Sequence, residues 1–164
     1  MARHVDAPGT PATLALARAG IAFTAHAYEH DPRTSNFGLE AAQKLGRDAE
    51  QVFKTLVADV AGTLTVAIVP VTGSLDLKAL AAAAGGGKAA MADPHLAERK
   101  TGYVVGGISP VGQRSALPTF LDESAILFET VLVSGGRRGL DIELAPDDLL
   151  AVTGGRYAAI ARRP

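Results

Sequence analysis

Residues 51–57, Gln-Val-Phe-Lys-Thr-Leu-Val, predict a β-strand that is covered on both faces and has a lysine at its centre. Successive side chains of a strand point to opposite faces, so Lys54 and Leu56 share one face while Phe53 and Thr55 share the other. Both faces are largely apolar, which is typical of a strand covered on two sides. A lysine is almost never fully buried without a partner. Lys54 is therefore either an edge-strand lysine that discourages aggregation or a charged group that faces a pocket.

Outward from this strand, helix and strand patterns follow one another without regular βαβ units. The strand extends over about 51–60 and turns at Ala61-Gly62 into a β-branched partner strand at 63–69. Apolar periodicity, caps and glycine stops predict helices at 10–20, 37–45, 75–84 (capped by Ser74), 94–100 and 146–152, and strands at 21–28, 88–91, 103–105, 117–121, 130–134, 140–144 and 156–160. This order favours an α+β fold, with a mixed, barrel-like β-sheet and short helices around it, over a doubly wound sheet.

The composition is that of one globular domain. The 164 residues are 48% hydrophobic and 20% charged, a balance typical of a folded chain rather than a disordered one. We expect a single domain over residues 10–164, preceded by a flexible N-terminal extension of residues 1–9. Cysteine is absent, which excludes disulfides, thiolate metal sites and an enzyme thiol as nucleophile.

The charge balance and the hydropathy of the chain limit its partners. Sixteen Lys and Arg residues face seventeen Asp and Glu residues, for a net charge of -1. No basic field predicts a nucleic-acid binder, so we expect no DNA partner, and electrostatics alone would hold RNA weakly. No apolar run approaches the roughly 20 residues needed to span a bilayer, and residues 1–6 lack the apolar core of a signal peptide. This predicts a cytoplasmic protein with no membrane partner.

Several motif matches fail on spacing or geometry. His26-Ala-Tyr-Glu-His30 matches the H-x-x-E-H pattern of zinc peptidases, but its surroundings predict a strand, on which the two rings would lie about 13 Å apart. The run Gly-Gly-Gly-Lys at 85–88 lacks the other residues of a phosphate loop, and Ser109 lacks the second glycine of a nucleophile elbow. Arg137-Arg138 and Arg162-Arg163 are typical of solvated surface charge. We therefore expect no metal and no cofactor.

Three features remain: Lys54-Thr55, the run Gly-Gly-Ile-Ser-Pro at 106–110, and residues 134–141, which contain Ser-Gly-Gly and Gly-Leu-Asp. Glycine pairs let the backbone approach a ligand and leave N–H groups to bind an oxyanion. A lysine adds a positive charge for a phosphate or a carbonyl oxygen. The same glycines also suit tight turns in a small barrel, so both interpretations stay open on the residues alone.

These features belong to a series of sequence blocks, which are Tyr-Glu-His-Asp at 28–31, Val-Phe-Lys-Thr-Leu at 52–56, Met-Ala-Asp-Pro at 91–94, and residues 101–110 and 133–143. The series resembles the YbaK-type Cys-tRNA(Pro) deacylases. That family is related to the editing insertion domain of bacterial prolyl-tRNA synthetases. The blocks run in order, with family-like spacing, over nearly the whole chain from about residue 10. The resemblance implies a compact α+β domain with a mixed, barrel-like sheet. It also implies hydrolysis of the ester in a tRNA charged with a small wrong amino acid.

The same resemblance implies the site residues. Lys54 matches the essential, catalytic lysine of the family. The positions around its aminoacyl-adenosine pocket correspond here to Tyr28, Phe37, Thr55, Gly106, Gly107, Ser134, Gly136 and Asp141. The substrate would be mischarged tRNA(Pro), and a transient complex with prolyl-tRNA synthetase would supply tRNA selectivity.

The resemblance further implies that the cysteine thiol of the substrate attacks its own ester carbonyl. A thiol with a pKa of about 8.5 is a usable nucleophile at neutral pH, whereas a serine hydroxyl needs activation. A pocket alone discriminates one methylene only about 10–200-fold, so chemistry rather than shape would exclude alanine. We expect Lys54 to act electrostatically and amides near Gly106 and Thr55 to bind the oxyanion. The alternatives are editing of another mischarged tRNA, such as Ala-tRNA(Pro), and a non-catalytic tRNA-binding module.

Overall fold

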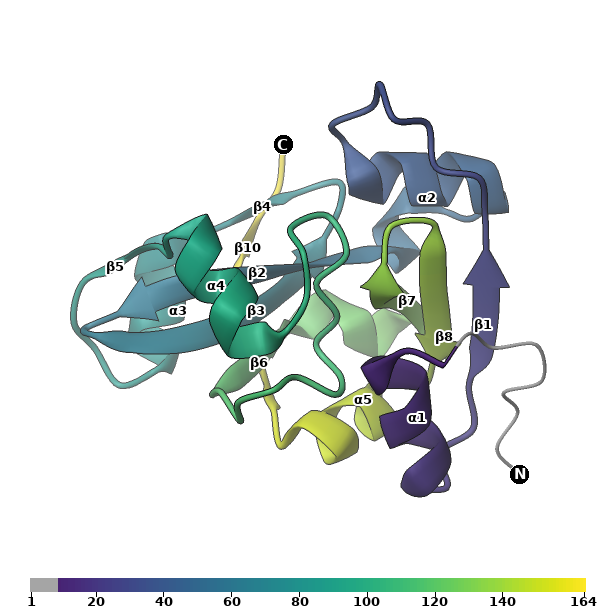
Figure 1. Ribbon diagram of the computed structural model, residues 1–164. Coiled ribbons are helices and arrows are strands. Elements are labelled where there is room, and N and C mark those ends of the chain that lie inside the picture. Colours follow the sequence, from purple (N-terminus) through teal and green to yellow (C-terminus); the bar gives the residue numbers. More distant parts are fainter. Residues whose placement is uncertain (1–8) are drawn as a thin grey trace.

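A five-stranded mixed sheet contains the central strand of the molecule (Figure 1). The computed structural model describes residues 9–164, so the extension predicted for residues 1–9 lies outside the described residues except for Gly9. Neighbouring strands are β5, β2, β3, β6 and β9, with bounds Ala89–Met91, Phe53–Val60, Thr63–Pro70, Thr119–Asp122 and Arg156–Ala158. β2 pairs antiparallel with β3 and β5, whereas β3 with β6 and β6 with β9 are parallel. The predicted mixed sheet is confirmed.

The β2–β3 hairpin follows from its two-residue turn. Ala61 and Gly62 have φ angles of +50° and +91°, as a type I′ turn requires. The two strands pair over their whole lengths. Side chains of β2 alternate between two apolar clusters, with Val57 in the first and Ala58 in the second. The prediction of a strand covered on both faces is confirmed.

A second sheet lies beside the first residues of β2. It contains β1, β8 and β7 in antiparallel order, with bounds Thr24–Ala27, Leu140–Leu144 and Val131–Arg137. A third pair joins β4 to β10, with bounds Ser74–Leu75 and Ala161–Arg162. Over residues 9–164 the sheets do not close into a barrel, so the barrel-like part of the prediction is wrong. β5 covers only residues 58–60 of β2, and β7 reaches the other end through one bridge, Val52 to Leu132, so the ladder of hydrogen bonds is not continuous.

Five α-helices within residues 9–164 pack around these sheets, and side-chain caps fix several of their starts. They are α1 (Pro11–Arg18), α2 (Phe37–Leu45), α3 (Leu77–Ala83), α4 (Pro94–Thr101) and α5 (Pro146–Thr153), with 3-10 turns at Ala49–Gln51 and Glu123–Leu127. Asn36 accepts a hydrogen bond from an N–H group in the first turn of α2. α3 is capped by Asp76, so the predicted cap Ser74 is wrong, because Ser74 pairs in β4. None of these helices is long and apolar enough to cross a membrane.

The segment between α4 and β6 departs from the prediction. The sequence predicts a strand at Tyr103–Val105, but this segment belongs to a turn in which the Gly107 N–H donates to the Val104 carbonyl. Gly106 has a φ of +91°, which an extended strand does not accommodate. The Tyr103 ring is buried and its hydroxyl donates to the Val111 carbonyl, so the aromatic residue anchors a loop rather than a strand. This loop forms one wall of the cleft described below.

Candidate functional site

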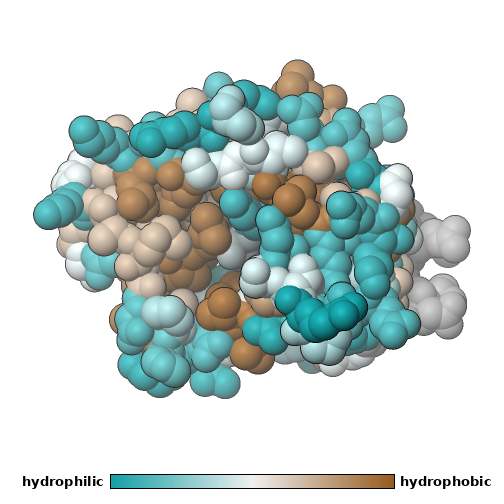
Figure 2. Space-filling view, turned by 90° about the horizontal axis from the view of Figure 1, so that it is seen from above, coloured by the Kyte–Doolittle hydropathy of each residue, from teal (hydrophilic) through white to brown (hydrophobic). Residues whose placement is uncertain are grey.

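A cleft of about 640 Å³ lies along the open edge of β2. Its walls come from residues 53–57 of β2, the start of α2, the 104–108 loop, and the ends of β7 and β8. Consecutive residues 53–57 line the cleft, so side chains from both faces of β2 reach it. The cleft therefore extends around the edge of β2, where β5 does not pair. Seen from above, the surface is hollowed near the middle, between apolar side chains on the left and hydrophilic ones on the right (Figure 2).

Lys54 lies in this cleft, opposite Val69 of β3. Its side chain is partly buried, and no described residue forms a hydrogen bond or an ion pair with the ammonium group. Burial lowers the pKa of Lys54, because the charged form loses solvation. A partly desolvated cation without a protein partner is available to a phosphate or to an oxygen that gains negative charge.

Asp141, at the beginning of β8, brings a carboxyl group into the same cleft. It is only 6% exposed. No side chain or backbone N–H among the described residues donates to it, and burial raises its pKa to about 7. Tyr28 lies close by, and burial, assisted by the charge of Asp141, raises the pKa of the Tyr28 hydroxyl to about 12. The cleft therefore holds a carboxyl group near its midpoint of ionisation at neutral pH beside a neutral phenol.

Thr55 contributes two polar groups that the fold itself does not use. Its hydroxyl is buried and has no hydrogen-bond partner in the described part of the chain. In a hairpin closed by a two-residue turn, alternate residues bond across the pair, and the register places Lys54 and Leu56 among the bonded ones. The Thr55 N–H therefore points away from β3. The Val57 carbonyl has the same orientation and accepts from Ala92. Beyond that bond the edge is open, so the Thr55 amide faces the cleft.

Seven of the nine predicted site residues line the cleft: Tyr28, Phe37, Lys54, Thr55, Gly106, Ser134 and Asp141. Gly107 and Gly136 lie behind it. A Cβ atom on Gly107 would lie 2.8 Å from the Arg137 backbone, and one on Gly136 would lie 2.9 Å from the Tyr103 ring. These two glycines permit close packing of the cleft wall. Ser134 accepts a hydrogen bond from the Gly136 N–H.

The two histidines of the H-x-x-E-H match have different partners. His26 is on β1 and bonds to Glu143 at 2.8 Å, while His30 follows the strand and bonds to Glu40 at 2.7 Å. Within residues 9–164 no cluster of three His, Cys, Asp or Glu side chains is arranged to hold a metal ion. The pattern therefore gives no zinc site in the described part of the chain.

Comparison with known proteins decides the family. The sequence profile of the aminoacyl-tRNA editing domain matches residues 33–152. The chain belongs to this editing-domain family. The editing domain is 42% identical over 125 residues to an Enterococcus faecalis protein named "Putative Cys-tRNA(Pro)/Cys-tRNA(Cys) deacylase EbsC", an alignment that covers 74% of this chain and 75% of the relative.

Solved structures show the same fold. A "putative trans-editing enzyme for prolyl tRNA synthetase" superposes with a TM-score of 0.79 at 28% identity, over 93% of this chain and 95% of the other. The hypothetical protein APE2540 gives a TM-score of 0.83 at 24% identity, over 93% and 100% of the two chains, and this likeness concerns the fold alone.

Arg137 lines the cleft of this editing domain although the sequence predicts solvated surface charge there, and the adjacent Arg138 contacts residues of the cleft wall from outside. Arg138 is exposed, as the sequence predicts, but its guanidinium also lies 4.7 Å from the centre of the Phe37 ring and donates two hydrogen bonds to the Val105 carbonyl. Its partners are distant in sequence and one is a backbone atom, so no local pattern indicates them. The glycines on either side of the arginine pair were the available hint, because they mark a turn that packs closely.

Proposed function

We propose that this editing domain is a trans-editing hydrolase that deacylates mischarged Cys-tRNA(Pro). The observation that carries the proposal is the unpartnered Lys54 ammonium in a cleft beside the open edge of β2. Membership in the aminoacyl-tRNA editing family and the printed name of the relative that is 42% identical support the substrate class. The domain would comprise residues 10–164.

In the proposed mechanism the substrate supplies the nucleophile. The cysteine thiol loses its proton to solvent, its sulfur bonds to the ester carbonyl carbon, and the bond from that carbon to the ribose oxygen breaks. The ribose oxygen takes up a proton, which leaves a cyclic thiolactone and free tRNA. This route suits a chain without cysteine, because a thiolate is a strong nucleophile at neutral pH whereas an unactivated hydroxyl is not.

The protein would contribute positioning and electrostatics. Lys54 holds the terminal phosphate or the carbonyl oxygen through its charge, and the outward N–H of Thr55 with that of Gly106 binds the oxyanion. As a carboxylate, Asp141 pairs with the α-ammonium group of the aminoacyl ester. Ser134 orients the ribose, while Tyr28 and Phe37 provide walls for the adenosine. Gly107 and Gly136 support this pocket from behind.

Partners and location follow from the chemistry of this substrate. A net charge of -1 gives the chain little electrostatic affinity for RNA. Prolyl-tRNA synthetase, bound transiently, would therefore bring the correct tRNA. The reaction needs no cofactor and no metal, and it belongs in the cytoplasm, where tRNA is charged.

Deacylation of Cys-tRNA(Pro), Ala-tRNA(Pro), Ser-tRNA(Pro) and Cys-tRNA(Cys) tests the proposal. We expect the wild type to release cysteine from tRNA(Pro) selectively, and Lys54→Ala to lose on the order of 100- to 1000-fold in rate, the usual effect of removing one oxyanion-stabilising group. Lys54→Arg should retain most activity if charge alone matters.

Two other results would redirect the proposal. Release of alanine at a similar rate would refute the thiol-assisted route and favour a shape-selective pocket. RNA binding without any turnover would leave a non-catalytic binding module.

A further inference from the structure

Val105 is held on both sides of its backbone by charged side chains. Its N–H donates to the Glu98 carboxylate of α4 at 2.8 Å. Its carbonyl accepts from the Arg138 guanidinium at 2.6 Å and 3.2 Å. Hydrogen bonds with an ionised partner are about twice as strong as neutral ones. Val105, itself 40% exposed, is therefore held between α4 and the β7–β8 turn.

The same guanidinium packs against the helix that begins the opposite wall. Arg138 lies over the ring of Phe37, the first residue of α2, at 4.7 Å from its centre. Gly106 makes this approach possible, because a Cβ atom there would lie 2.6 Å from the Arg138 Nε and 2.9 Å from the Phe37 ring. Loop, turn and helix thus meet at one guanidinium, at the rim of the cleft.

We propose that Arg138 is a positioning residue of the cleft, which fixes the Val105–Gly106 backbone against Phe37 and so sets the place of the Gly106 amide. The inference rests on the proposed function for its kinetic part and on geometry alone for its structural part. Arg138 itself does not line the cleft, so its effect passes through the loop.

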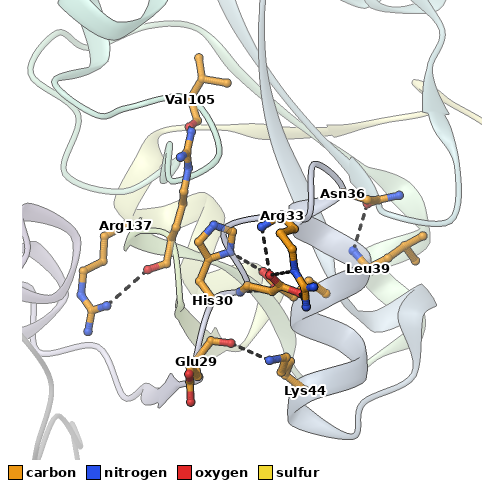
Figure 3. A network of polar contacts seen from close by, with 11 residues as sticks. Glu29, His30, Arg33, Asn36, Leu39, Lys44, Val105 and Arg137 are labelled. Atoms are coloured by element: carbon orange, nitrogen blue, oxygen red, sulfur yellow. Dashed lines mark hydrogen bonds and ion pairs between the residues drawn. The ribbon is translucent and has the colours of Figure 1, made fainter.

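Only an arginine satisfies this geometry. The planar guanidinium presents two N–H donors to one carbonyl while its face lies on an aromatic ring, and a lysine ammonium offers neither the fork nor the face. The neighbouring Arg137 lines the cleft, and within residues 9–164 its guanidinium donates only to the Arg138 carbonyl, at 3.3 Å (Figure 3). The two adjacent arginines therefore have different roles.

Amide hydrogen exchange tests the structural part without any substrate. In Arg138→Ala we expect the amides of residues 105–107 to exchange on the order of tenfold faster, because the loop opens more often once its carbonyl partner is lost. Arg138→Lys should resemble Arg138→Ala. The matched control is Arg163→Ala, which removes an exposed arginine whose described contact is Glu50, outside the cleft. Unchanged exchange in Arg138→Ala would refute the proposal.

Deacylation kinetics test the positioning part. We expect kcat to fall on the order of 10- to 100-fold in both Arg138 variants, since small displacements of catalytic groups cost that much. KM should change less, because the ligand walls remain. Faster exchange with unchanged kcat would refute a positioning role. If the wild type deacylates none of the four substrates, the proposed function fails, while the exchange result still decides whether Arg138 holds the loop.

Discussion

Two carboxylates two residues apart on β8 have opposite surroundings. Glu143 accepts hydrogen bonds from His26, Arg47 and Thr130 at 2.6–3.0 Å. Burial opposes its ionisation, but these donors outweigh burial and lower the pKa of Glu143. Asp141 has no such donor among the described residues, and burial raises its pKa to about 7. The fold thus supplies hydrogen-bond donors to the Glu143 carboxylate, whereas the Asp141 carboxyl faces the cleft without one among the described residues.

The difference separates structural charges from functional ones. The Glu143 carboxylate joins β1, β8, the residue before β7 and the segment after α2, and both of its oxygens accept hydrogen bonds. In the cleft, the Lys54 ammonium, the Asp141 carboxyl and the Thr55 hydroxyl are buried or partly buried, and none of them has a partner within residues 9–164. Unsatisfied polar groups cost stability and persist where a ligand completes them. Three substitutions test this contrast.

Asp141→Asn should give the largest change, and it should be stabilising. The folded pKa of about 7 exceeds the ordinary 3.8, so the folded wild type holds a proton that the unfolded chain has lost, and its stability falls as pH rises through this window. Each pKa unit corresponds to about 1.4 kcal/mol of folding free energy. Above pH 7 the charged Asp141 therefore costs the folded state on the order of 4 kcal/mol, which Asn removes, and below about pH 4 there is no such cost to remove. Denaturant unfolding of both proteins between pH 4 and 8 measures the difference. Equal stability at pH 8 would mean that Asp141 has a partner in solution.

Glu143→Gln, the same chemical change on the same strand, should destabilise. Because the pKa of Glu143 is lowered in the folded state, the carboxylate stabilises the fold fully above its ordinary pKa of 4.5. This stabilisation is lost as the pH falls through the pKa of the folded state. We expect a loss of about 2 kcal/mol at neutral pH, typical of hydrogen bonds to a charged group, and a smaller loss in acid. Turnover per folded molecule should not change. If Glu143→Gln were more stable than the wild type, the proposed difference between Glu143 and Asp141 would be refuted.

Thr55→Val should have the smallest effect on folding. It replaces a buried, unbonded hydroxyl by a methyl group, so stability should rise by about 1 kcal/mol while KM for the aminoacyl-tRNA increases. Thr65→Val is the matched control, because that buried hydroxyl donates to the Thr63 carbonyl and its removal should cost about 1 kcal/mol. Calorimetry of the two variants should show melting temperatures that move in opposite directions.

Local chemistry predicted much of the fold. The β2–β3 hairpin followed from Ala61-Gly62, and most helices from caps and glycine stops close to their ends. The missing barrel closure was not predictable, because it depends on long-range pairing at both ends of β2, where β5 covers only residues 58–60 and β7 makes a single bridge. The same applies to Tyr103–Val105, where strand-like residues form a turn because Gly106 and a buried tyrosine ring fix the backbone otherwise.

The candidate site divides in the same way. Lys54 was conspicuous from the sequence because a charge interrupts an apolar strand. Gly106, Ser134 and Asp141 lie in two glycine-rich segments that the residues alone also indicated, whereas Tyr28 and Phe37 were indicated by family resemblance. Arg138 and the outward Thr55 amide depend on contacts and register that only three-dimensional structure provides.

Along residues 58–60, β2 is paired on both sides, whereas along residues 53–57 it is an edge strand that β5 does not cover. Backbone groups that a longer β5 would consume in sheet pairing are thereby released for molecular recognition. A bound aminoacyl ester would take the place of the missing neighbour, and Lys54 would keep a second protein chain from doing so. The length of β5 then determines how much of the β2 edge stays open to the cleft. Extending β5 by two residues should close this opening.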